Sequence, residues 1–283
     1  MRKTEFKVTS EYENRTVGDI LKKTLGISAS LLTVLKRSEG ILLDGKCVTV
    51  RERVRCGQTV SLEIREEAPS ENIVPVEMPL DILYDDEDML AVSKPHGMAI
   101  HPSAHHYENT LGNAVMYHFR NQPFVYRPIT RLDRDTTGVV LIAKNKLSAA
   151  LLTDLMADKK IIKTYTALLS AVPVPLRGKV EAPIDRCGDS VIKREVSEGG
   201  KYSLTHYSVV KINPDGTCLA RLNPVTGRTH QIRVHMAHIG CPLMYDFLYG
   251  EEQEGKHYIL HCNSLELPHP VTGKKLIIES KQT

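Results

Sequence analysis

Over much of this chain, hydrophobic positions alternate with polar ones, and this pattern predicts strands. Beyond residue 81 the apolar runs are short and end at turn residues. Strands are expected over residues 82–84, 89–93, 139–143, 164–170, 203–212, 218–222, 231–235 and 276–279. One clear helix is expected over residues 148–159, where leucine and methionine recur at helical spacing. The pattern therefore predicts an α+β fold, with a mixed, mainly antiparallel β-sheet flanked by helices and loops.

The beginning of the chain has a pattern of its own. Thr16 and Asp19 have a spacing similar to a helix capping box, so a first helix should start there. The other elements expected are a helix over 30–37, a strand over 40–43 that ends in an Asp-Gly turn, and a strand over 59–64. Residues 67–81 are rich in proline and acidic side chains and are a predicted linker. We expect a small α/β domain over 1–66 and a larger domain over 82–283.

Composition is typical of a globular protein and narrows the function only slightly. Hydrophobic residues make up 41% of the chain and charged residues 25%, and no apolar stretch is long enough to span a membrane. A cytoplasmic monomer without membrane contacts is expected. The six cysteines include no Cys-x-x-Cys pair, which favours reduced thiols. Residues 68–89 carry seven acidic and no basic residues, so the two flanking domains are basic and permit a polyanionic partner.

The stretch from Arg131 to Gly138 is the first candidate for chemistry. It reads Arg-Leu-Asp-Arg-Asp-Thr-Thr-Gly and runs directly into the apolar strand expected over 139–143. An acidic residue between two arginines, just before a buried strand, is where a fold can hold a carboxylate rigidly. Asp133 is therefore a candidate reactive group. The pattern alone leaves open a simpler Asx-turn with surface ion pairs.

A second polar run covers residues 226–238, within which a strand is expected. Strand periodicity places Thr229, Gln231, Arg233 and His235 on one face, and His230, Ile232 and Val234 on the other. Buried polar groups need partners, and Arg233 is the natural counter-ion for Asp133. The histidines of this run suggest a metal site, but His230 and His235 fall on opposite faces and no known ligand spacing is present. No metal is expected.

Two shorter segments also stand out. Lys94 to Gly97 reads Lys-Pro-His-Gly, and its proline and glycine predict a rigid turn packed beneath a site. Lys163 to Tyr165 reads Lys-Thr-Tyr at the start of an expected strand. A tyrosine on a strand is most often a packing residue, so this segment alone does not point to chemistry.

The order of these segments is more specific than any one of them. Lys-Pro-x-Gly, Arg-Leu-Asp-x-x-Thr-Thr-Gly, Lys-x-Tyr and Arg-x-His-Gln-Ile-Arg-x-His together resemble the motifs of the RluA-type pseudouridine synthases, and the resemblance spans residues 82–283. It implies an isomerase that acts on RNA without a cofactor. It also implies that Asp133 is the catalytic residue, that Tyr165 stacks near the target base and assists proton transfer, and that Arg233 is the salt-bridge partner.

The same resemblance suggests the residues that bind RNA. Arg131 is implied in extruding the target base, and Arg228, His230 and Gln231 are expected to contact the substrate. The chain departs from the family pattern at three positions, Thr130, Thr137 and Tyr245. Tyr245 stands where a glycine is usual, and a glycine there can serve a positive φ angle.

The N-terminal layout resembles the αL-motif RNA-binding domain, with Lys36 and Arg37 at the end of its second helix. These two residues are expected to bind RNA. An appended module of this kind favours a large structured substrate, so ribosomal RNA is the expected one. A synthase that acts on tRNA, a non-catalytic RNA-binding protein and a metal-dependent hydrolase remain as alternatives.

Overall fold

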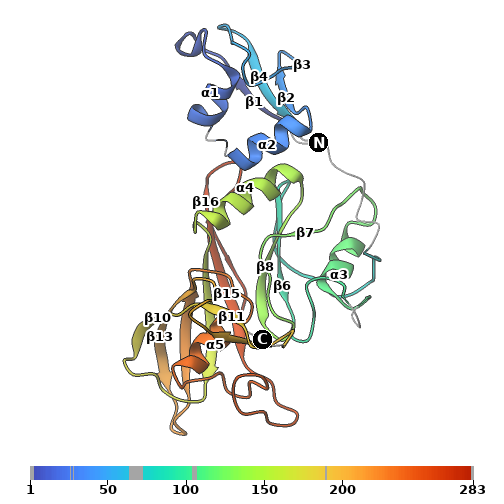
Figure 1. Ribbon diagram of the computed structural model, residues 1–283. Coiled ribbons are helices and arrows are strands. Elements are labelled where there is room, and N and C mark those ends of the chain that lie inside the picture. The colour runs from blue at the N-terminus through green and yellow to red at the C-terminus, as the bar shows by residue number, and fades with distance from the viewer. Residues whose placement is uncertain are drawn as a thin grey trace.

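Two hydrophobic cores organise the molecule, one in the N-terminal module and one in the larger body (Figure 1). The structure is a computed structural model that describes residues 3–25, 27, 29–63, 73–103, 107–188 and 190–281. Within these ranges the chain forms a four-stranded, a ten-stranded and a two-stranded sheet, with helices packed around them. The predicted α+β class is confirmed.

The N-terminal module is built on the four-stranded sheet, whose order is β1-β4-β2-β3. Its elements are β1 (Lys3–Lys7), a 3-10 helix (Ser10–Tyr12), α1 (Val17–Asp19), a π-helix (Ile20–Thr24), α2 (Ala29–Arg37), β2 (Ile41–Leu43), β3 (Lys46–Cys47) and β4 (Thr59–Glu63). Thr16 caps α1 as predicted, because its hydroxyl oxygen accepts a hydrogen bond from the Asp19 backbone N–H at 3.1 Å. Asp44 and Gly45, both at positive φ, make the predicted turn between β2 and β3. The pattern does not predict β1, which is short and mostly charged.

The larger body is built on the ten-stranded sheet, whose main path runs β10-β13-β14-β9-β15-β8-β6-β5. Its strands are β5 (Asp81–Asp85), β6 (Met89–Lys94), β7 (Arg127–Pro128), β8 (Thr137–Ala143), β9 (Ile162–Leu169), β10 (Arg177–Glu181), β13 (Leu204–Ile212), β14 (Cys218–Pro224), β15 (Leu260–Pro268) and β16 (Lys275–Glu279). β15 pairs with β8 in parallel, and the other strand pairs in this sheet are antiparallel. The sheet is thus mixed and mainly antiparallel, as predicted. A separate hairpin joins β11 (Ile184–Arg186) to β12 (Arg194–Val196).

Three helices accompany this sheet: α3 (Leu111–His118), α4 (Lys146–Ala157) and α5 (Gln231–His238). The helix predicted over 148–159 is α4, shifted by two residues. The pattern misses α3, although its capping box is visible in the sequence: Thr110 accepts from the Asn113 backbone, and the Asn113 side chain accepts from the Thr110 backbone. None of the helices in the described ranges is long and apolar enough to cross a membrane.

The strand predicted over 231–235 is wrong, because these residues form the start of α5. The division into two strand faces is therefore wrong as well. The six residues from Gln231 to Met236 are all buried, so the helix has no polar face that would reveal its period. Ile232 and Val234 favour strand when considered locally, and tertiary burial overrides that preference.

Helix α4 contributes to both hydrophobic cores. Leu147 is buried in the N-terminal core, with Leu151 packed against that core, whereas Leu152 is buried in the core of the larger body. Figure 1 shows α2 lying over α4, and the two helices are in contact. The N-terminal module is therefore seated on the larger body through one face of α4.

The predicted linker lies partly outside the described residues. Residues 73–80, which are described, form no helix or strand, but they are fastened to α3. The Asn113 side chain donates to the Val74 carbonyl at 2.8 Å, and the Asn113 carbonyl accepts from the Val76 N–H at 3.2 Å. The domain boundaries at residues 66 and 82 stay a prediction.

Candidate active site

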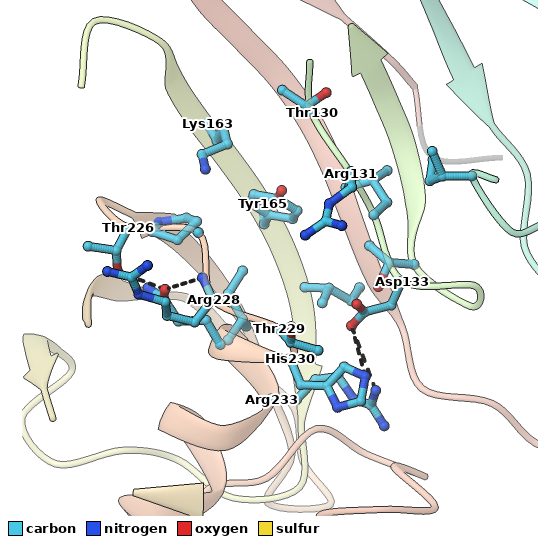
Figure 2. Close-up of a pocket in the computed structure, with 18 of the residues that line it drawn as sticks. Thr130, Arg131, Asp133, Lys163, Tyr165, Thr226, Arg228, Thr229, His230 and Arg233 are labelled. Carbon is cyan, nitrogen blue, oxygen red and sulfur yellow. Dashed lines mark hydrogen bonds and ion pairs between the residues drawn. The ribbon is translucent and has the colours of Figure 1, made fainter. Parts of the chain in front are cut away.

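A pocket of about 540 Å³ opens beside the centre of the large sheet, within the size range of small-molecule sites. The loop before β8, the start of β9 and the start of α5 supply most of its walls. Seven residues singled out from the sequence line it: Arg131, Asp133, Tyr165, Arg228, His230, Gln231 and Arg233. Figure 2 shows Asp133 beside His230 and Arg233 at one end, and Lys163 and Thr226 towards the other.

Asp133 lies in a tight turn that leads into β8. The Thr136 backbone N–H donates to the Asp133 carbonyl at 3.2 Å, which closes the turn. Thr137 is already the first residue of β8, so this strand begins two residues earlier than expected from the sequence. The Asp133 side chain is 28% exposed and can therefore meet a substrate. Asp135, two residues later, does not line the pocket and pairs with Arg134 at 3.0 Å.

Lys94 fixes this turn from beneath. Its side chain is buried, and its Nζ donates to the carbonyls of Pro95, Met98 and Arg134 at 2.8, 2.9 and 2.8 Å. Burial lowers the pKa of Lys94 to about 8, although the nearby carboxylates oppose this, so the group is still charged at neutral pH. Lys94, at the start of the predicted rigid turn, thus holds the backbone of Arg134, the residue that follows Asp133.

Arg233 is the most constrained side chain of the pocket. Its Nε and Nη2 each donate to the Asp246 carboxylate at 2.7 Å, and its Nη1 lies 3.7 Å from Asp133 Oδ2. The sequence correctly predicts Arg233 beside Asp133, but the main partner is Asp246, which is fully buried. Asp246 is fully buried, so it needs a bidentate partner to offset the cost of its desolvation. Asp133 is partly exposed and does not need one.

Three aromatic rings surround the same guanidinium. Its carbon lies 5.3, 5.0 and 4.4 Å from the ring centres of Phe247, Tyr249 and Tyr258. Burial alone would lower the pKa of Arg233, but the hydrogen bonds to Asp246 outweigh it and raise the pKa further. Arg233 is therefore a permanent cation, held in one orientation next to Asp133.

Tyr165 forms part of the pocket wall on β9. It is paired across the sheet with Cys262 of β15, and burial raises the pKa of its hydroxyl well above 10. The phenol therefore keeps its proton at neutral pH. Figure 2 shows its ring between Lys163 and Arg131, where a flat ligand could stack on it.

Cations dominate the pocket lining. Arg131, Lys163, Arg228 and Arg233 line it, and Asp133 is the one acidic residue among the lining residues, all of which lie in the described ranges. Arg131 and Arg228 are exposed, whereas burial lowers the pKa of Lys163. Since Arg233 is already paired with Asp246 and faces Asp133, three other cations remain for a ligand, and the pocket suits an anion such as an RNA phosphate.

Gln231 is placed in the pocket wall but has no free amide group. Its oxygen accepts from the Thr226 hydroxyl at 2.7 Å and the Arg228 N–H at 3.0 Å, and its nitrogen donates to the Leu204 carbonyl and the Thr205 hydroxyl at 2.9 Å each. These bonds satisfy the whole side chain. The expected RNA contact of Gln231 therefore has no geometric support, and its amide instead holds the loop that carries Arg228.

Lys36 and Arg37 do not line the pocket. Both are exposed at the end of α2, in the N-terminal module (Figure 1). Any contact that they make with RNA is therefore separate from the pocket.

The histidines of α5 do not form a metal site in the described part of the chain. His235 is buried, and its two ring nitrogens lie 2.9 and 3.0 Å from the Thr205 hydroxyl and the Ala182 carbonyl. The one group with metal-ligand spacing in the described ranges is Asp86, Asp88 and His269. His269 Nδ1 accepts from two backbone N–H groups and its Nε2 lies 2.8 Å from Asp86, so these atoms already serve the loop between β15 and β16.

Sequence reasoning missed Asp246, because no spacing rule links it to Arg233. The family pattern did single out Tyr245, the residue before Asp246. Tyr245 has φ 62°, the conformation that explains the usual glycine, and is held by Lys256, whose Nζ donates to the tyrosine hydroxyl at 3.1 Å. Tyr249 was also missed, since only the fold brings it against α5.

Comparisons with known proteins identify the family of this chain. A family model described as RNA pseudouridylate synthase matches residues 88–238. A Bacillus subtilis protein named uncharacterized RNA pseudouridine synthase YjbO is 37% identical over 256 residues, which cover 89% of this chain and 90% of the relative. The ribosomal large subunit pseudouridine synthase D of Pseudomonas aeruginosa is 35% identical over 257 residues, covering 85% and 79%.

Solved structures agree as well. The human protein named RNA pseudouridylate synthase domain containing 1 superposes with a TM-score of 0.62 and 27% identity, covering 72% of this chain and 84% of that one. The family match and the shared fold, a mixed sheet with flanking helices, make this chain an RNA-modifying enzyme. The chain belongs to the RNA pseudouridylate synthase family and is an RNA isomerase.

Proposed function

We propose that this enzyme converts specific uridines of ribosomal RNA to pseudouridine, with Asp133 as its catalytic carboxylate. One observation carries the proposal: Asp133 is the acidic residue of a cationic pocket, and its Oδ2 lies 3.7 Å from the immobile Arg233. The relatives whose names state a substrate, such as the Pseudomonas aeruginosa protein, are named for the ribosomal large subunit. This name supports ribosomal RNA as the substrate.

The reaction requires an anionic carboxylate and no change of oxidation state. The bond between the uracil nitrogen and the ribose carbon breaks, the uracil turns, and a ring carbon bonds to the same ribose carbon. That ring carbon loses a proton, and the freed nitrogen carries one in the product. Asp133 either attacks the ribose or takes a proton from it, and both roles need an ionised carboxylate.

Tyr165 is suited to hold the uracil during this sequence. The target base must leave its stack to reach Asp133, at a cost of a few kcal/mol that aromatic stacking offsets. Because burial keeps the Tyr165 hydroxyl protonated, it can donate a hydrogen bond or a proton to the separated base. Arg131, which is exposed next to Asp133, is placed to occupy the space that the base leaves.

Affinity for the rest of the RNA comes from cations outside the reacting centre. Arg228 and Lys163 suit the phosphates of the target strand, and Lys36 and Arg37 of the N-terminal module suit a more distant part of a large RNA. Reversing both charges, Lys36→Glu with Arg37→Glu, should raise KM and leave kcat unchanged. A fall in kcat with unaltered KM would contradict this division of roles.

The catalytic assignment is tested by Asp133→Asn, which keeps the shape of the side chain and removes its charge. We expect pseudouridine formation to fall by at least about 1,000-fold, because the residues that line the pocket include no other carboxylate that could replace Asp133. Asp185→Asn, on the exposed β11, is the matched control and should retain full activity. Substantial activity of Asp133→Asn would refute the assignment.

The substrate is tested by mapping pseudouridine in a strain that lacks this protein. Loss of modification at ribosomal RNA sites, restored by the unchanged gene and not by Asp133→Asn, is the expected result. Loss confined to tRNA would replace ribosomal RNA by tRNA as the substrate. An unchanged modification map, together with RNA binding by the purified protein, would favour the non-catalytic alternative.

A further inference from the structure

His230 has an unusual backbone and a well-defined environment. It is the N-cap of α5, with φ 57° and ψ 17°, and its side chain makes no capping hydrogen bond. Residues other than glycine adopt this left-handed conformation at a cost in free energy and keep it only where their surroundings impose it. The ring instead has Tyr249 on one side, at its Nδ1, and Asp133 on the other, at its Nε2. Figure 2 shows the ring beside Asp133.

The hydrogen bonds around Tyr249 define the tautomer of His230. The Tyr249 hydroxyl oxygen accepts from the Arg194 backbone N–H at 2.9 Å and lies 2.8 Å from His230 Nδ1. A phenol has one proton to donate, and among the described residues the acceptor within reach is Nδ1. Nδ1 therefore accepts, and the proton of the neutral ring is on Nε2. That nitrogen lies 4.0 Å from Asp133 Oδ2.

The ring is neutral in this setting. Burial is the largest influence on the pKa of His230 and lowers it, Asp133 and Asp246 oppose the shift, and Arg233 and Arg194 add to it. These four charged groups influence the pKa of His230 after burial. A neutral imidazole with its single N–H towards Asp133 can donate a hydrogen bond without cancelling the charge of the carboxylate.

We propose that His230 is a positioning residue for Asp133, with its Nε2–H directed at Oδ2 by the Tyr249 hydroxyl. Arg233 Nη1 approaches the same oxygen, at 3.7 Å. Two N–H groups thus face Oδ2, at 3.7 and 4.0 Å, and hydrogen bonds from them would fix the rotation of the carboxylate. No described residue donates to Oδ1, which is left for the reacting ribose. The separation of 4.0 Å shortens to a hydrogen bond when RNA fills the pocket, as catalytic contacts commonly do.

The inference rests on the proposed role of Asp133 and changes the expected role of His230. From sequence, His230 was a residue that contacts the substrate. In the structure its two ring nitrogens face protein groups, one on each side. It therefore acts on the reaction through Asp133, and its loss should lower kcat more than it changes KM.

Two substitutions separate this role from a purely structural one. In His230→Gln the amide nitrogen can reach the position of Nε2, but glutamine adopts a positive φ poorly. In His230→Asn the backbone is well accommodated, but the shorter amide cannot reach Asp133. We expect kcat to fall about 10- to 100-fold in His230→Asn and clearly less in His230→Gln, with KM changed little in both.

Three other outcomes would overturn the proposal. If His230 serves only the backbone conformation, the kcat of His230→Asn will equal or exceed the kcat of His230→Gln. If His230 binds RNA directly, both variants will raise KM and keep kcat. If both keep kcat and KM, no role at Asp133 remains. Asp133→Asn is measured alongside: an inactive Asp133→Asn with normal kcat in the His230 variants would reject this inference alone, whereas an active Asp133→Asn would reject the proposed function itself.

The tautomer gives a readout that does not depend on activity. Long-range ¹H–¹⁵N spectra of the histidine rings, with the His230 signals assigned by their loss in His230→Gln, should show protonation at Nε2. Tyr249→Phe removes the donor to Nδ1 and should shift these signals towards the Nδ1–H form, whereas Tyr117→Phe, away from the pocket, should not. An Nδ1–H ring in the unchanged protein, or identical signals in Tyr249→Phe, would overturn the proposal.

Discussion

At the scale of the residue, the environment of Arg233 explains how the pocket is ordered before any RNA arrives. The guanidinium has a buried carboxylate on one edge, aromatic rings on its faces, and Asp133 within 3.7 Å of its remaining nitrogen. A group with so many fixed neighbours has no alternative orientation. It provides a constant positive potential at the carboxylate, at no cost in reorganisation during the reaction.

This arrangement predicts the effect of Arg233→Lys. A lysine keeps the charge but lacks the planar fork, so it cannot serve Asp246 and Asp133 together. We expect kcat to fall by about 100-fold and the free energy of unfolding to fall by about 3 kcal/mol, because Asp246 loses its bidentate partner. Single-turnover kinetics and urea denaturation measure the two effects.

The matched control for stability is Arg228→Lys, an exposed arginine of the same pocket, which should unfold as the unchanged protein does. If Arg233→Lys retained wild-type kcat, the fork would be dispensable and the fixed orientation would have no catalytic value.

Gly138 predicts a second effect at this scale. It has φ +108°, and a Cβ there would lie 2.7 Å from the backbone nitrogen of Cys262 and against the carbonyl group of the same residue. Gly138→Ala should therefore force β8 and β15 apart and lower the free energy of unfolding by more than about 2 kcal/mol. Gly216→Ala, also at positive φ but with nothing within 4 Å, isolates the backbone strain from the clash. Equal losses in both variants would show that the close approach does not matter.

At the scale of the element, α4 contributes to both hydrophobic cores, because its opposite faces pack against different parts of the molecule. Leu147 and Leu151 face the N-terminal module, and Leu152 faces the sheet of the larger body. Met156, near the other end of the helix, lines the pocket. One rigid helix therefore connects the N-terminal module to the pocket wall.

Leu147→Ala tests this connection. Truncating a buried leucine costs about 2–4 kcal/mol, and here the loss falls on the N-terminal core. We expect the amides of β1 to β4 to exchange faster with solvent, while those of β8 keep their protection. Thr153→Ala, on the exposed side of α4, should change neither. Equal loss of protection in both sheets would mean that the two modules open together.

Local pattern predicted part of the fold, for a physical reason. Most strands of the large sheet have alternation or short apolar runs, and the leucines of α4 recur at helical spacing, so these elements were predicted. The strands β7, β10 and the central β15 were not predicted. The first six of the eight residues are buried in both α3 and α5, so neither helix shows a regular change between buried and exposed positions. The order of the motifs singled out Asp133, Tyr165 and Arg233, and the structure places all three in one pocket. The pair of Arg233 with Asp246 depends on a loop whose path no local pattern reveals.

At the scale of the whole molecule, buried histidines predict how stability depends on pH. Burial is the largest influence on the pKa values of His230 and His235, and it lowers both below the usual 6.5. The folded state therefore binds fewer protons than the unfolded state once the pH falls below about 6.5. The free energy of unfolding should decrease as the pH drops from 7.5 towards 5. Urea denaturation across this range measures it, with a shallower slope expected for His235→Gln, and an unchanged free energy at both ends would contradict the expectation.

The position of β15 has a consequence for how the enzyme is made. This strand lies between β8 and β9, although 90 residues, from 170 to 259, separate it from β9 along the chain. The half of the sheet that carries Asp133 and the half that carries Tyr165 meet only through it. A nascent chain that has not reached residue 260 cannot join the halves, however long it waits. Catalytic competence therefore requires β15 (Leu260–Pro268) to have been synthesised, and a chain that stops before this strand would have no assembled pocket with which to modify RNA.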